Sequence, residues 1–89
     1  MIDHAIVDRL LKIVAEIAGP GRTPADLGPH TPLRDGGVWL DSVALLELIV
    51  ASEAEFAVSF DPMSDFGDSA LATVGSLGAV IARRLREQA

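Results

Sequence analysis

The residues best placed for chemistry are the pair Asp41-Ser42, which stands at the start of an apolar segment. A serine hydroxyl reacts as a nucleophile when a base activates it, but no base such as histidine lies near Ser42 in the sequence. Cysteine is absent, which excludes disulfides, thiolate metal sites and cysteine nucleophiles. His4 and His30 are isolated in the sequence and predict no metal site. A catalytic site within the chain itself is therefore the weakest interpretation.

Composition narrows the class of protein further. The chain has 89 residues, 49% of them hydrophobic, and a net charge of −6, which fits one small domain spanning residues 1–89. The acidic balance argues against nucleic-acid binding and favours partners with basic surfaces. Apolar runs fall short of the roughly 20 residues that span a bilayer, and residues 1–11 lack the pattern of a signal peptide. We therefore expect a cytoplasmic monomer that does not bind membranes.

Three segments have the apolar periodicity of amphipathic helices. The first is expected from Asp3 to Ala18, the second from Asp41 to Phe56 and the last from Thr73 to Arg86. Asp3 and Thr73 are good N-caps, and Gly19-Pro20-Gly21 ends the first helix. The expected inward residues are Ile6, Leu10, Ile13 and Ile17 in the first helix, Leu45, Leu48, Ile49, Ser52 and Phe56 in the second, and Val74, Leu77, Ile81 and Leu85 in the last.

The connections between these helices are unequal in length. Residues 19–40 form a long loop with four prolines, in which Leu27, Leu33 and Val38 are the expected core contacts. Gly36-Gly37 is expected to allow a close backbone approach before the second helix. Residues 61–72 are polar and hold at most a short third helix; their aspartates offer a weak surface cation site at most. The prediction is an all-α fold, a small four-helix bundle with a long first loop.

Segment 40–49, Leu-Asp-Ser-Val-Ala-Leu-Leu-Glu-Leu-Ile, resembles the prosthetic-group attachment site of acyl carrier proteins. In that family an Asp-Ser pair opens the second helix and a hydrophobic residue follows, here Val43. A Glu-Leu pair comes five and six residues after the serine, here Glu47 and Leu48. Residues 53–56 and 73–74 also resemble the end of that helix and the start of the last one. The likeness covers nearly the whole chain, as in a discrete, type II carrier.

The resemblance implies a role for each part of this segment. A separate phosphopantetheinyl transferase would attach 4′-phosphopantetheine from coenzyme A to Ser42, with Asp41 beside it, and the thiol of the arm would carry an acyl group. Acyl-loading, condensing or tailoring enzymes with basic docking patches would bind the outer face of the second helix. That face comprises Val43, Leu46, Glu47, Val50 and Glu53. Such binding is expected to be weak, because a carrier must leave one enzyme to reach the next.

Departures from the family pattern modify this interpretation. Trp39 stands where the family usually has a glycine; we expect it to cover the edge of the core, the alternative being contact with the arm or its cargo. Ala44 and Ala54 replace residues that are often acidic in fatty-acid carriers, which favours a dedicated pathway, polyketide-like or specialised fatty-acyl. Ser52 replaces a common leucine, and the alternatives are that it faces solvent, bonds back to a carbonyl one turn earlier or lines a polar-tolerant cargo cavity. The remaining alternatives are a peptidyl or aminoacyl carrier and an unmodified helical docking domain.

Overall fold

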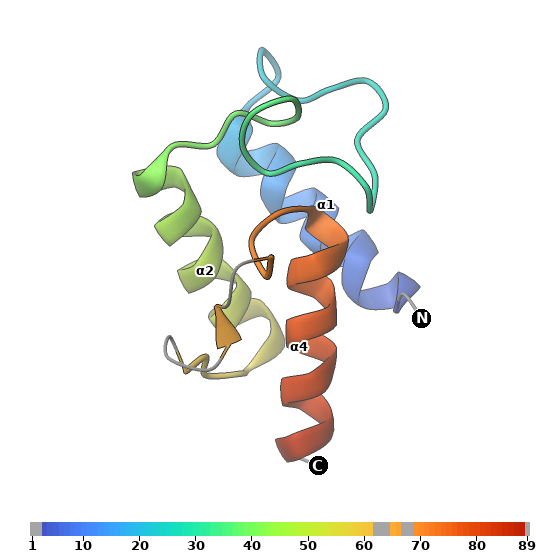
Figure 1. Ribbon diagram of the computed structural model, residues 1–89, viewed down its shortest axis with the longest axis vertical. Coiled ribbons are helices and arrows are strands. Elements are labelled where there is room, and N and C mark those ends of the chain that lie inside the picture. The colour runs from blue at the N-terminus through green and yellow to red at the C-terminus, as the bar shows by residue number, and fades with distance from the viewer. Residues whose placement is uncertain (1–2, 62–64, 67–68, 89) are drawn as a thin grey trace.

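The computed structural model describes residues 3–61, 65–66 and 69–88, and its architecture is all-α. Helices α1 (His4–Ala18), α2 (Ser42–Phe56) and α4 (Val74–Gln88) account for the regular structure of these residues (Figure 1). The described part therefore has three helices rather than the four expected. The short helix predicted within 61–72 involves residues 62–64 and 67–68, which lie outside the described residues.

Each helix begins where the sequence places an N-cap. The Asp3 carboxylate accepts a hydrogen bond from the N–H of Ile6 at 3.2 Å, which starts α1. At the start of α4, the N–H of Ser76 donates to the Thr73 hydroxyl and the N–H of Thr73 donates to the Ser76 hydroxyl, both at 3.0 Å. Gly19 follows α1 with a φ of 79°, a positive value that glycine adopts at low cost. Local capping thus sets the ends of these helices.

The core lies between the three helices and the long first loop, because α1 packs against both α2 and α4. The buried face of α1 is rotated slightly from the predicted one. Val7 and Val14 are buried, whereas Ile13 and Ile17 are only partly buried at the edge of the core. In the other two helices the predicted residues lie inward, with Ile49 and Leu85 partly exposed. The fully buried large side chains are Leu10, Leu33, Leu48, Leu77, Ile81, Val14, Val38 and Val74.

The loop between α1 and α2 folds over the end of the bundle where α2 and α4 begin (Figure 1). Leu33 and Val38 are fully buried as predicted, and Leu27 packs against the core. Gly37 provides the expected close approach: a Cβ added there would lie 2.0 Å from the carbonyl oxygen of Pro32. Pro32 also pairs with Thr73 in an isolated β-bridge. The loop is therefore anchored by its own core contacts and by the start of α4.

Among the residues that the structure describes, two polar side chains are buried, those of Ser52 and Asp65. Ser52 is completely buried, and its hydroxyl donates to the carbonyl oxygen of Leu48 at 2.7 Å. The back-bonding alternative is thus confirmed, and the solvent-facing one is wrong. Asp65 is buried and paired with Arg83 and Arg84, so it belongs to an ion-pair cluster and not to a surface cation site.

Two further predictions concern membrane-spanning helices and the aspartates of segment 61–72. No helix within the described residues is long and apolar enough to cross a membrane. Asp68, one of the aspartates of segment 61–72, lies outside the described residues.

Candidate functional site

Ser42 is the first residue of α2, and its side chain is exposed. Asp41 precedes it as the N-cap: its carboxylate accepts from the N–H of Ala44 at 2.8 Å, and its carbonyl oxygen accepts from the N–H of Leu45 at 2.9 Å. Leu45 is buried on the inner side of the same turn. These contacts fix the first turn to the core, so the hydroxyl of Ser42 occupies a defined place at the end of a rigid helix.

The surroundings of Ser42 are suited to holding a phosphodiester. The N-terminus of an α-helix carries a partial positive charge and favours negative groups. The cap occupies one oxygen of Asp41 with a backbone N–H, and an exposed arginine, Arg22, lines the same surface hollow as Asp41. Within the described residues, no group of three or more His, Cys, Asp or Glu side chains is arranged to hold a metal ion. The positive end of α2 and the exposed Arg22 are the features that would favour a phosphodiester attached to Ser42.

A groove of about 640 Å³ opens beside this first turn. Its walls are the turn that follows α1 and the segment that leads into α2. The lining residues are Gly21, Arg22, Thr23, Pro24, Gly37, Trp39 and Asp41. Because Asp41 is both a wall of the groove and the neighbour of Ser42 in the chain, a group attached to Ser42 would begin at the edge of this groove.

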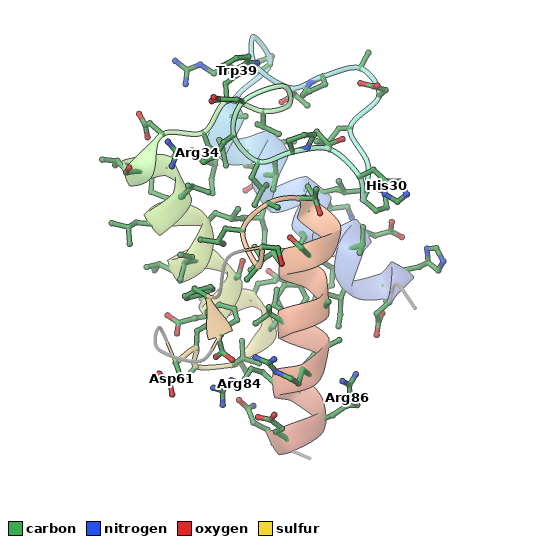
Figure 2. All side chains as sticks on the ribbon, in the orientation of Figure 1. His30, Arg34, Trp39, Asp61, Arg84 and Arg86 are labelled. Carbon is green, nitrogen blue, oxygen red and sulfur yellow. The ribbon has the colours of Figure 1, made fainter. Side chains whose placement is uncertain are left out.

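Trp39 is 60% exposed and has a φ of 60°, in the left-handed region that non-glycine residues rarely adopt. Its backbone N–H donates to the carbonyl oxygen of Arg34 at 3.0 Å. It is not among the described side chains that form the core or pack against it. The expectation that Trp39 covers the edge of the core is therefore wrong. Figure 2 shows it at the loop end of the molecule, far from Asp61 and Arg84.

The outer face of α2 is apolar where the sequence predicted partner contacts. Val43, Leu46 and Val50 are between 62% and 65% exposed. Together with Glu47 and Ala51 they line a shallow hollow of about 400 Å³. Exposed aliphatic side chains that share one helix face are typical of an interaction surface. We call these five residues the α2 outer patch.

The acidic residues near this patch differ in what they contact. Glu47 is exposed on the patch. Glu53 is only half exposed, and its carboxylate accepts from the backbone N–H of Phe60 at 2.9 Å, so it holds the segment that follows α2. Glu55 pairs with Arg9 of α1 at 2.6 Å. Sequence reasoning missed the structural role of Glu53, because nothing in the helix pattern indicates a bond to a backbone group seven residues away.

The helices and the loop described above correspond to a known family. A family model for the phosphopantetheine attachment site matches residues 8–81. Among curated proteins and solved structures, none matches the chain significantly. The matched range starts within α1, ends within α4 and contains the groove and the exposed serine. The chain therefore belongs to the phosphopantetheine attachment family of carrier proteins, and its cofactor is a covalently attached 4′-phosphopantetheine.

Proposed function

We propose that this chain is an acyl carrier protein whose arm is attached to Ser42. It would shuttle thioester-bound acyl intermediates between the enzymes of a dedicated biosynthetic pathway. The observation that carries the proposal is the exposed hydroxyl of Ser42 on the first turn of α2, inside the range matched by the family. Domains of this family are in general non-catalytic, and we propose the same for this chain, with residues 1–89 acting as one domain.

The attachment step needs nothing from this chain except an accessible oxygen. The Ser42 oxygen would form a bond to the phosphorus of the phosphopantetheine group of coenzyme A. The bond from that phosphorus to adenosine 3′,5′-bisphosphate would break, and the hydroxyl proton would pass to the phosphopantetheinyl transferase. The thiol of the arm supplies the thioester chemistry once it is attached. This chain's contribution is position: the cap by Asp41 holds the first turn in place while the transferase acts.

The α2 outer patch supports docking of partner enzymes through apolar contacts more than through charge. Its aliphatic residues are well exposed, whereas Glu53 and Glu55 are engaged by other groups of the chain. Glu47 remains available to a basic residue of the partner. We propose that the partners are acyl-loading, condensing or tailoring enzymes. Because the contacts are mainly apolar, the affinity for them should depend only modestly on salt concentration. They also favour a polyketide-like or specialised fatty-acyl pathway over a housekeeping one.

The test is intact mass spectrometry after incubation with coenzyme A, Mg²⁺ and a broad-specificity phosphopantetheinyl transferase. We expect the native chain to gain the mass of one phosphopantetheine and the Ser42→Ala variant to gain none. Ser59→Ala is the matched control, since Ser59 is also exposed but follows α2 instead of opening it. It should load like the native chain.

Either of two results would refute the assignment. Loading of Ser42→Ala would place the arm on another residue, and a folded native chain that stays unmodified with several transferases would not be a carrier. Circular dichroism establishes that each variant is folded. Loading the holo protein with acyl and aminoacyl donors then distinguishes an acyl carrier from an aminoacyl carrier.

A further inference from the structure

We propose that the groove between Trp39 and the turn after α1 is a binding site for the part of the arm nearest the protein. In this arrangement the indole ring packs against the geminal methyl groups of the arm, and Arg22 balances the charge of the phosphodiester. The inference rests on the proposed function, because the arm must first be attached to Ser42. It adds a site where the arm rests on the surface between encounters with enzymes.

The first observation is the conformation of Trp39. Its φ of 60° is unfavourable for any residue with a Cβ, and its large apolar ring is 60% exposed. The residues on both sides of it, Val38 and Leu40, are buried at 0% and 3% exposure. With both neighbours fixed in the core, the backbone holds the ring outward. Such strain, combined with exposure of an aromatic ring, points to a ligand that the ring contacts.

The second observation is that the facing wall is ordered by its own hydrogen bonds. The N–H groups of Arg22 and Thr23 donate to the carbonyl oxygen of Gly19 at 3.2 and 3.1 Å, and the Thr23 hydroxyl donates to the same oxygen at 2.8 Å. The opposite wall is held by the hydrogen bond from the backbone N–H of Trp39 to the carbonyl oxygen of Arg34. The groove is therefore formed before the arm arrives, which lowers the entropy cost of holding it.

The third observation is the distance along the chain. Trp39 is three residues before Ser42, so their Cα atoms are at most about 11 Å apart. The groove reaches Asp41, whose Cα is about 3.8 Å from that of Ser42. The phosphate and the geminal methyl groups are the first parts of the arm beyond the serine oxygen. They are thus the parts that reach a positive charge and an apolar ring in this groove.

Tryptophan fluorescence tests the proposal directly, because Trp39 is the only tryptophan of the chain. The chain is measured before and after attachment, with attachment established by intact mass. We expect the emission maximum to shift to shorter wavelength, and the acrylamide quenching constant to fall about twofold, since the arm would cover one of the two faces of the ring.

Proton NMR of the loaded chain provides the second readout. Ring current from Trp39 should move the signals of the two geminal methyl groups apart and upfield, and Trp39→Gly should return them to the positions seen in free pantetheine. Arg22→Gln should reduce the shift. Arg34→Gln should not, because Arg34 is exposed in the same loop but does not line the groove.

The two proposals fail in different ways. Loading with unchanged emission, quenching and methyl signals would overturn the groove as a site for the arm and leave the carrier function standing. A folded chain that gains no mass would overturn both. A methyl shift that persists in Trp39→Gly would place the arm elsewhere on the surface and also overturn the groove proposal.

Discussion

Replacing Asp65 with asparagine tests how the segment after α2 is fastened to α4. Asp65 has a completely buried side chain and accepts hydrogen bonds from Arg83, from Arg84 at 2.7 Å and from the N–H of Asp61 at 2.7 Å. Removing one member of a buried ion pair costs about 3–5 kcal/mol when the other member stays buried. Arg83 and Arg84 are 44% and 23% exposed and both lie within 4 Å of Glu87, so they keep water and a second partner. We therefore expect Asp65→Asn to lower the free energy of unfolding by about 2–3 kcal/mol.

The assay is urea unfolding followed by circular dichroism. With a slope near 1 kcal/mol per M, as in small domains, the midpoint should fall by about 2–3 M at pH 7. The matched control is Asp8→Asn, because Asp8 is exposed on α1 and should change the free energy of unfolding by less than about 0.5 kcal/mol. Loading at Ser42 should be unchanged at pH 7 in the absence of urea. Arg84, the partner of Asp65, lies at the opposite end of the molecule from Trp39, which is three residues from Ser42 (Figure 2).

The same variant makes a prediction about pH. Burial alone would raise the pKa of the Asp65 carboxyl, but hydrogen bonds from Arg84, from the Asp61 N–H and from Arg83 outweigh it and lower the pKa below its usual 3.8. A carboxyl with a lowered pKa stabilises the fold above its unfolded value, and this stability is lost as the pH falls through the folded value. The difference between Asp65→Asn and the native chain should therefore be full at pH 7 and should shrink below about pH 3.8. An equal urea midpoint at pH 7, or a difference that grows in acid, would refute the reasoning.

Further predictions concern the loop, the cap and the outer patch. Gly37→Ala should lower the free energy of unfolding by more than about 2 kcal/mol, because its Cβ would meet the carbonyl oxygen of Pro32 at 2.0 Å. Gly36→Ala should lower it by only about 1 kcal/mol, the cost of a φ of 86° in a residue with a Cβ. Urea midpoints in the reverse order would contradict this. Asp41→Ala should cost about 1 kcal/mol and slow loading by the transferase, and Asp41→Asn should restore both; equal loading rates for the two variants would count against the cap. Leu46→Ala should weaken binding to a partner enzyme more than Glu47→Gln does, measured by titration at two salt concentrations; a larger effect of Glu47→Gln that disappears in salt would show charge-driven docking instead.

Much of the fold follows from signals that are local in the sequence. The starts of α1 and α2 are each set by an aspartate that caps the N–H three residues later, a contact that needs only the chain near it. The exposed face of α2 follows from the helical period, because placing Leu48 inward leaves Leu46 and Val50 outward. The Asp-Ser pair with its Glu-Leu partner indicated the family, which the match over residues 8–81 confirms.

The tertiary structure decided the features that depend on distant partners. Asp65 is separated from Arg84 by 19 residues, so no local pattern distinguishes it from an exposed loop aspartate. Glu53 has the helical position of a docking residue, but the chain turns after α2 and brings the N–H of Phe60 to it. The conformation of Trp39 was also beyond sequence reasoning, because a left-handed φ at a non-glycine residue arises only when the packing of its neighbours outweighs its own preference. Helical period and capping act within a few residues, whereas ion pairs between segments and backbone strain exist only after the core has formed.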